Sequence, residues 1–224
     1  LFQIALENAS AEIKKKYKPI FWKSPEKYFA TAVLKEEDFK RAFCAKCKKP
    51  FWSVIARKVC GDPACSGEGF AFIGKSPAQN KLSYVDVWKK FSTMFQKLGY
   101  TPIQRYPSVA RWNPTMEYTN ASIAAFQPYV ISGEVEPPAN PLVIPQFCLR
   151  FSDTDNVGIT MSHNTGFVMI GQHMFVKPEA WNQNESFRHM LQWNIKGLGL
   201  KKEDMTFHED AWAGGGNLGC CMEM

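Results

Sequence analysis

Four cysteines in two short-spaced pairs are the clearest candidates for chemistry in this sequence. Two residues separate Cys44 from Cys47, four separate Cys60 from Cys65, and twelve lie between the pairs. Two such pairs bring four thiolates to the corners of a tetrahedron, which is the geometry of structural zinc. Buried free thiols and two disulfides are the alternatives. The spacing favours zinc in a closed, structural site within a reducing compartment.

Three lysines flank the first cysteine pair, and three further cysteines lie outside the two pairs. Lys46, Lys48 and Lys49 lie beside Cys44 and Cys47 and can offset the negative charge of four thiolates. The remaining cysteines, which we expect to be ordinary buried thiols, are Cys148, Cys220 and Cys221.

A single arginine follows an apolar stretch near the middle of the chain. Arg150 lies on the non-aromatic face of a strand that we predict over residues 146–151. A guanidinium in that position needs an anion, either a carboxylate or a phosphate. Asp153 and Asp155 follow in a turn, so an internal ion pair stays open beside a phosphate site.

Two further groups are suited to ligand contact. His163 and Phe167 stand four residues apart, and a flat aromatic ring near a phosphate-ready arginine is a plausible nucleotide platform; the alternative is that Phe167 is core. The run 214–217, Gly-Gly-Gly-Asn, lets the backbone approach a ligand closely or acts as a flexible turn. It is neither a P-loop nor a dinucleotide fingerprint. Trp212 before it is an anchor or a core residue.

The elements that must position these residues follow from periodicity. We predict helical pieces in 1–40, a helix over 83–98 capped by Ser83 and ended by Gly99, and a helix over 185–198. We predict strands over 102–112, 146–151, 157–161 and 166–175, a rigid loop over 134–146, and a polar linker over 75–82. Helices therefore flank consecutive antiparallel strands, which is an α+β architecture.

Composition limits the class of protein. The chain has 224 residues, 45% hydrophobic, with 21% charged and a net charge of +6, which is typical of globular proteins. No stretch reaches the roughly 18 apolar residues that a membrane span needs, and the first residues lack a secretory signal pattern. We divide the chain into a helical segment (1–40), a four-cysteine module (41–74) and a larger domain (83–224).

The order of these motifs resembles the N-terminal part of archaeal-type alanyl-tRNA synthetases, from about Arg41 to Met224. The residues that carry the resemblance are the cysteine module with Pro50-Phe51-Trp52 and Cys60-Gly61-Asp62-Pro63, then Arg105-Tyr106-Pro107, Ala110-Arg111-Trp112, Ala121-Ser122-Ile123, Phe126-Gln127-Pro128, residues 137–142, Cys148-Leu149-Arg150, Asp155-Asn156-Val157-Gly158 and Trp212-Ala213-Gly214-Gly215-Gly216-Asn217. The combination is far more specific than any single match.

The resemblance implies a class II synthetase fold, an antiparallel sheet flanked by helices. It also implies a cytoplasmic enzyme that forms alanyl-adenylate from L-alanine and ATP with magnesium and passes alanine to tRNA(Ala). In this family Arg150 is the motif 2 arginine that holds the α-phosphate and the amino-acid carboxylate. The other implied contacts are Asp153, His163 and Phe167 with ATP, and Trp212, Gly214, Gly215 and Gly216 with alanine.

The sequence departs from the family in three places. Ser162 stands where the family has Arg, Val168 where it has Glu, and Gly219-Cys220 where it has Gly-Pro. The family's motif 3 and amine-binding Asp are not found before Met224. We therefore expect a fragment, one half of a split enzyme with a second polypeptide carrying motif 3, or a degenerate paralogue. We expect this chain alone not to charge tRNA and to exchange pyrophosphate poorly, if at all.

Two other functions stay open at this point. The first is a non-catalytic class II-like paralogue that binds a nucleotide, tRNA or a protein partner through the same cleft. The second is a zinc-ribbon nucleic-acid module fused to an unrelated α+β domain.

Overall fold

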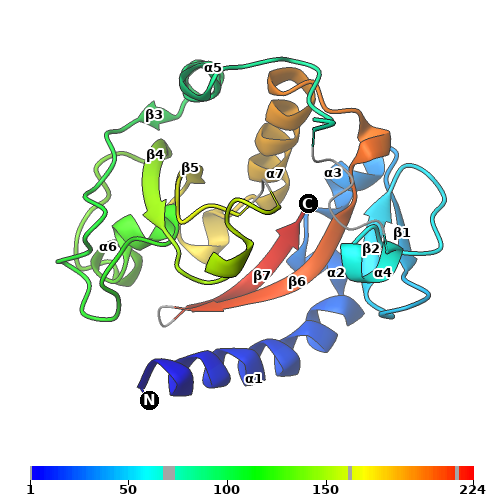
Figure 1. Ribbon diagram of the computed structural model, residues 1–224, viewed down its shortest axis with the longest axis horizontal. Helices are drawn as coiled ribbons and strands as arrows, with labels where there is room; N and C mark the ends of the chain where they lie inside the picture. The colour runs from blue at the N-terminus through cyan, green and yellow to red at the C-terminus, as the bar shows by residue number, and fades with distance from the viewer. Residues whose placement is uncertain (1, 68–73, 161–162, 215–216) are drawn as a thin grey trace. The chain divides into compact units, whose positions relative to one another are not determined.

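The computed structural model of this chain describes residues 2–67, 74–160, 163–214 and 217–224 (Figure 1). Contacts divide the chain into two compact units. Unit 1 comprises Leu1–Ala71, Asn182–Ile195 and Gly199–Met224, and unit 2 comprises Phe72–Trp181 and Lys196–Leu198. Within the described ranges, no helix is both long and apolar enough to cross a membrane. The three segments predicted from the sequence have different boundaries. Unit 1 combines most of the segments 1–40 and 41–74 with the C-terminal part of the segment 83–224.

Unit 1 contains a four-stranded antiparallel sheet with the strand order β1-β2-β6-β7. Its helices are α1 (Phe2–Lys23), α2 (Pro25–Tyr28), α3 (Thr31–Glu36), α4 (Pro63–Ser66) and α7 (Gln183–Gln192), and its strands are β1 (Lys40–Phe43), β2 (Pro50–Ser53), β6 (Phe207–Gly214) and β7 (Asn217–Glu223). Short turns Trp193–Gly197, which runs into unit 2, and Lys202–Asp204 precede β6. Helix α1 packs along β6 (Figure 1).

The core of unit 1 is apolar and aromatic. Its main cluster joins α3, β2, α7 and β6 through the buried residues Val33, Leu34, Phe39, Trp52, Leu191, Met205 and Phe207. Phe39 and Phe207 meet edge to face at 5.1 Å between ring centroids. A second cluster of Phe21, Phe29 and Ala211 joins the first two helices to β6. Large aromatic side chains dominate such cores because each buries a large apolar area.

A buried carboxylate ties four elements of unit 1 together. The side chain of Glu209 in β6 is fully buried, and Arg41 of β1 donates two hydrogen bonds to it, each 2.7 Å long. Trp52 Nε1 of β2 donates a third at 2.7 Å. Trp22 Nε1 of α1 donates to the Glu209 carbonyl at 2.9 Å, and Arg41 also donates to the Trp22 carbonyl. A charge is tolerated inside a core only when it is paired in this way.

Unit 2 is built on a three-stranded sheet, β3-β4-β5, in which β4 and β5 are antiparallel and β3 pairs with β4 in parallel. The elements are α5 (Tyr84–Lys97), β3 (Thr101–Pro102), a 3₁₀ turn Ser122–Phe126, α6 (Tyr129–Ser132), β4 (Leu142–Leu149), a 3₁₀ turn Thr154–Asn156, β5 (Gly166–His173) and a 3₁₀ turn Pro178–Ala180. Its core contains Ala125, Phe126, Leu142 and Ile144.

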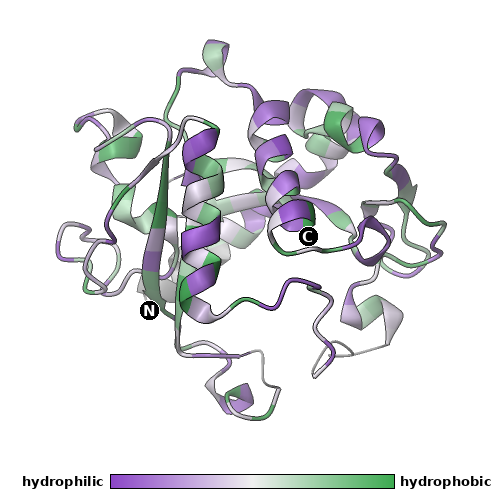
Figure 2. Cartoon of the chain, turned by 90° about the horizontal axis from the view of Figure 1, so that it is seen from above, coloured by the Kyte–Doolittle hydropathy of each residue, from purple (hydrophilic) through white to green (hydrophobic). Residues whose placement is uncertain are grey.

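Helix α5 follows its sequence signals closely. The Ser83 hydroxyl accepts a hydrogen bond from the Asp86 backbone N–H at 3.2 Å, which caps the helix as predicted. Gly99 adopts φ +88°, a left-handed conformation that suits a glycine after a helix. Phe91 and Phe95 are fully buried. Figure 2 shows α5 lengthwise, left of centre, with hydrophilic and hydrophobic residues alternating along it.

Several predicted strands differ from the observed ones. The strand predicted over 102–112 is wrong, because within that range only Pro102 of β3 (Thr101–Pro102) belongs to a ladder and Val109 forms an isolated bridge to Tyr118. The prolines at 102 and 107 donate no ladder hydrogen bond. Residues 157–160 form turns, not a strand, and residue 161 lies outside the described part. The predicted loop 134–146 ends at residue 141, and β4 then begins with three buried residues, Leu142, Val143 and Ile144. The hairpin β6–β7 is not among the predictions.

The two faces of β4 differ in burial. Phe147 and Leu149 share a side, since both approach Gly166, and they are half-buried. Gln146 and Cys148 on the other side are completely buried. Gln146 is satisfied there because it accepts from the Tyr106 N–H at 2.9 Å and donates to the Tyr106 and Phe147 carbonyls.

Removing the buried carboxylate is expected to destabilise unit 1 severely. Glu209→Ala leaves the Arg41 guanidinium and the Trp52 N–H without their acceptor in the core, and breaking a buried ion pair costs about 3 to 5 kcal/mol. Urea denaturation followed by tryptophan fluorescence measures the loss. Glu36→Ala removes an exposed carboxylate bound to Arg188 and serves as the control, with an expected loss of about 1 kcal/mol or less. Equal losses in the two variants would contradict the role of Glu209.

Candidate functional site

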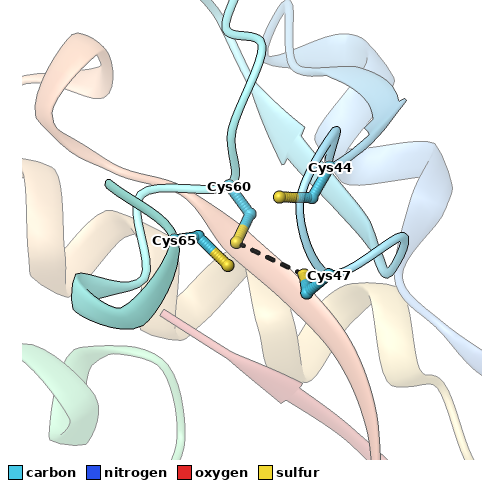
Figure 3. A group of neighbouring side chains, drawn as sticks. All are labelled: Cys44, Cys47, Cys60 and Cys65. Atoms are coloured by element: carbon cyan, nitrogen blue, oxygen red, sulfur yellow. Dashed lines mark hydrogen bonds between the residues drawn. The ribbon is translucent and has the colours of Figure 1, made fainter. Parts of the chain in front are cut away.

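The four predicted cysteines converge in unit 1. Cys44 follows β1, Cys47 lies in the turn before β2, and Cys60 and Cys65 come from the loop and helix α4 that follow β2 (Figure 3). Their sulfur atoms all lie within 4.8 Å of one another, and Cys47 Sγ and Cys60 Sγ are 3.9 Å apart. A zinc ion bound tetrahedrally at about 2.3 Å from each sulfur places the sulfurs about 3.8 Å apart. The cluster therefore fits zinc, and all seven cysteines are free thiols, so the disulfide alternative is not formed.

Local sequence explains why the sulfurs meet. The Cys44 N–H donates to the Lys49 carbonyl and the Lys48 N–H donates back to the Cys44 carbonyl, each at 3.0 Å, which closes the first turn. Lys48 takes φ +63° there. In the second turn, the Asp62 carboxylate caps α4 by accepting from the Ala64 N–H at 2.8 Å, which directs Cys65 toward the cluster.

The thiols of the cluster differ in acidity. Burial raises the pKa of Cys44, but hydrogen bonds from the backbone of Cys47, Cys60 and Lys46 outweigh it and lower that pKa to about 6. Burial raises the pKa of Cys60 to about 12 and also raises the pKa of Cys65. Backbone N–H groups aimed at a sulfur are a common way to support a metal thiolate, because they stabilise its negative charge.

Arg150 lies just beyond the last residue of β4 and is exposed. Its Nε donates to the Asn120 carbonyl at 2.9 Å, and its guanidinium lies 5.1 Å from the centre of the Phe167 ring on β5. Within the described part, neither Asp153 nor Asp155 forms an ion pair with it, so the internal pair left open by the sequence is absent. The guanidinium is therefore oriented but not neutralised.

The other predicted nucleotide contacts lie in the same unit but are not joined to this pair by described contacts. Asp153 is exposed and takes φ +57° at the start of the turn Thr154–Asn156. His163 lies before β5, and its Nδ1 shares a 2.6 Å hydrogen bond with Thr160 Oγ1. Ser162 lies outside the described residues. Val168 follows Phe167 on β5 and pairs with Phe147, so it lies on the opposite face of the strand from Phe167.

Of the predicted alanine-pocket residues, Trp212 and Gly214 lie on β6 in unit 1. Trp212 is 38% exposed and pairs with Gly219. A Cβ added to Gly214 would lie 3.2 Å from Trp212 Cζ2, so the indole lies against this backbone and would have to shift slightly to make room for a larger residue. Gly215 and Gly216 lie outside the described residues.

Three polar residues that position this chemistry are not among the sequence predictions. Asn120 orients Arg150 through its backbone carbonyl, which no side-chain pattern reveals. Glu209 and Gln146 are buried polar residues inside strands, and sequence patterns assign such residues to the surface. Of the other cysteines, Cys148 is completely buried, as expected, whereas Cys220 is exposed and Cys221 half-buried on β7. The expectation of buried thiols is wrong for Cys220, because β7 is an edge strand in the described sheet.

Comparison with known protein families assigns the larger part of the chain. The family model of class II tRNA synthetases (A) matches residues 86–223. The chain belongs to this family. Its fold is accordingly that of a class II synthetase domain, with antiparallel sheet and flanking helices. The match begins in α5 and excludes the cysteine cluster.

Curated relatives extend the similarity to most of the chain. It is 45% identical over 214 residues to an alanine--tRNA ligase of Methanocella arvoryzae, covering 95% of this chain and 24% of that protein. It is 43% identical over 201 residues to one of Thermococcus kodakarensis and 42% identical over 201 residues to one of Archaeoglobus fulgidus, covering 87% and 88% of this chain and 22% of each relative. The chain thus spans about a quarter of the length of the relatives it matches.

We expect one zinc ion per chain, bound by Cys44, Cys47, Cys60 and Cys65. Elemental analysis of purified protein after gel filtration measures it. Cys60→Ser is expected to lose most of the metal and to unfold the turns around the cluster, because a small module depends on its metal for folding. Cys148→Ser, which changes a buried cysteine outside the cluster, is expected to retain the metal. Folded, zinc-free wild-type protein would contradict this assignment.

Proposed function

We propose that this chain is the N-terminal part of an alanine--tRNA ligase. The reaction joins L-alanine and ATP into alanyl-adenylate and transfers the alanine to tRNA(Ala), and we place the protein in the cytoplasm. The proposal is supported by family membership and by relatives named alanine--tRNA ligase, each about four times as long as this chain. The observation that carries it is the oriented, uncompensated guanidinium of Arg150 over Phe167.

Arg150 has the properties that adenylate formation requires. Its Nε is occupied by the Asn120 carbonyl, which fixes the plane of the guanidinium, and no described residue accepts from its two terminal nitrogens. The two terminal nitrogens of an exposed guanidinium can make a planar, bidentate contact with an anion. We assign them to the α-phosphate and the alanine carboxylate. Negative charge grows on the phosphate in the transition state, so a fixed arginine stabilises that state more than the bound substrate.

Phe167 supports the adenine base in this proposal. The ring is half-buried at the start of β5, and the guanidinium lies over it. An aromatic face that already contacts a cation suits a base that stacks near the phosphates. We also assign Asp153 and His163 to ATP, with magnesium accompanying its phosphates. Val168, which replaces the family carboxylate, lies on the other face of the strand from Phe167. The replacement therefore leaves the stacking contact intact.

The small amino acid is assigned to the hairpin of unit 1. The Trp212 indole lies against the backbone of Gly214. A bulky aromatic ring and a close backbone suit a pocket that admits a methyl group and little more. We propose Trp212, Gly214, Gly215 and Gly216 as its wall. Such a pocket rejects amino acids larger than alanine by steric exclusion. Steric exclusion of a larger side chain is more effective than rejection of a smaller one.

Arg150→Ala and Phe167→Leu are expected to weaken binding of a non-hydrolysable alanyl-adenylate analogue. Losing a charged hydrogen-bonding partner reduces affinity about 10- to 100-fold, and losing the stacking face about 3- to 10-fold. Titration calorimetry measures both. Arg111→Ala changes an exposed arginine of the same unit and is expected to bind as wild type does. Unchanged affinity in both test variants would exclude this surface as the nucleotide site.

Alanine-dependent pyrophosphate exchange separates the enzyme from a catalytically deficient paralogue. We expect weak exchange by the chain alone, because the family arginine is replaced by Ser162, and one missing charged contact lowers such rates about 100- to 1000-fold. A second polypeptide carrying motif 3 is a further proposed partner, and adding it to the assay is expected to raise exchange. Analogue binding without exchange under either condition would indicate the paralogue.

A further inference from the structure

An exposed, basic surface surrounds the turns of the cysteine cluster. It consists of Lys46, Lys48, Lys49, Lys58 and the aromatic Phe43, and we call it the knuckle surface. All five side chains are exposed, and Phe43 is 61% exposed. The surface lies outside residues 86–223, which the synthetase family model matches, and none of its residues has a part in the site of the proposed function.

The positive charge of this segment exceeds what the metal site needs. Residues 40–66 contain seven Lys and Arg against one Asp. A zinc ion with four thiolates carries two net negative charges, so the segment stays strongly positive after compensation. Arg41 is neutralised by Glu209, whereas none of the four lysines forms an ion pair with a described carboxylate. Lysines without acidic neighbours are the usual footprint of a polyanion.

The cysteine turns hold these lysines in fixed positions relative to one another. The Ala45 N–H donates to the Lys58 carbonyl at 2.9 Å, which joins the first turn to the second loop. The Cys44 N–H donates to the Lys49 carbonyl at 3.0 Å. Both bonds involve backbone next to cluster residues, so a bound metal fixes the spacing of the lysine backbones, although each exposed side chain stays flexible. Lysines on a fixed backbone lose less conformational entropy on binding than lysines of a mobile loop do.

Phe43 adds a different kind of contact to the charge. It is the last residue of the edge strand β1, directly before Cys44 and opposite Pro50. The Arg41 guanidinium lies 5.1 Å from the centre of its ring. An exposed phenylalanine costs hydration free energy in the free protein, and this one stands beside the Arg41 guanidinium. Aromatic rings between basic side chains bind nucleic acids by stacking on a base while the cations contact the backbone.

We propose that the knuckle surface binds RNA, with the lysines on consecutive phosphates and Phe43 stacked on an unpaired or terminal base. The choice of tRNA(Ala) as the RNA rests on the proposed function, but the surface itself does not. An acidic protein would use the charges but not the exposed ring, so Phe43 favours RNA.

The test compares two double variants of the zinc-loaded chain. Fluorescence anisotropy with a labelled tRNA(Ala) transcript is measured over a series of KCl concentrations. Lys46→Gln/Lys49→Gln is expected to bind about tenfold more weakly, and the slope of log K against log salt is expected to fall by about 1.5, because each phosphate contact contributes about 0.7 to 0.9. The matched control, Lys89→Gln/Lys90→Gln, removes two exposed lysines from α5 and is expected to bind as wild type does.

Phe43 is tested separately because stacking and charge respond differently to salt. Phe43→Ala is expected to weaken binding about tenfold at every salt concentration without changing the slope, and Phe43→Tyr is expected to restore it. Wild-type affinity in the knuckle variants, or an equal loss in the α5 control, would overturn the inference.

Calorimetry with the alanyl-adenylate analogue separates this inference from the proposed function. Retained analogue binding in the Lys46→Gln/Lys49→Gln variant shows that a loss of RNA affinity is not a loss of fold. RNA binding that depends on these lysines, in a wild-type chain that does not bind the analogue, supports the surface while the proposed function fails.

Discussion

The carboxylate of Glu209 is the constraint on which unit 1 depends. It accepts hydrogen bonds from β1 and β2, while its backbone carbonyl accepts one from α1. A buried carboxylate with three charged or polar donors has one satisfactory arrangement of its neighbours, and any other alignment leaves a charge unpaired. The network therefore fixes the position of β2 beside β6. The turns of the cysteine cluster follow β1 and β2, and Trp212 lies on β6. Their positions therefore depend on this alignment.

How much the sequence predicts differs between the metal cluster and the strands. The cysteine spacing predicts the cluster in full, because four ligands of one type in two short pairs leave few other arrangements. Helix α5 is equally accessible, since its cap, its apolar periodicity and its terminal glycine agree with one another. The class II fold comes from the resemblance of many motifs taken together, and the family match confirms it.

The strands are less accessible because their inward positions hold polar residues. Glu209 in β6 and Gln146 in β4 are completely buried, and each interrupts the alternation by which a strand is recognised. Their partners lie far away in the sequence, with Arg41 168 residues from Glu209 and Tyr106 40 residues from Gln146. The candidate nucleotide site has the same difficulty. The sequence predicts Arg150 and Phe167, but the carbonyl of Asn120 that orients the arginine carries no signature.

The nested arrangement of the two units has a consequence for the order of events during synthesis. Unit 2 is formed almost entirely by one continuous stretch, Phe72–Trp181, whereas unit 1 needs both the beginning and the end of the described chain. On a ribosome the first strands, with Arg41 and Trp52, emerge long before Glu209. Unit 2 completes its own contacts during that interval, while the sheet of unit 1 still lacks its last two strands. Unit 1 must bring together segments that are far apart in the sequence, so its folding is expected to be the slow step during synthesis.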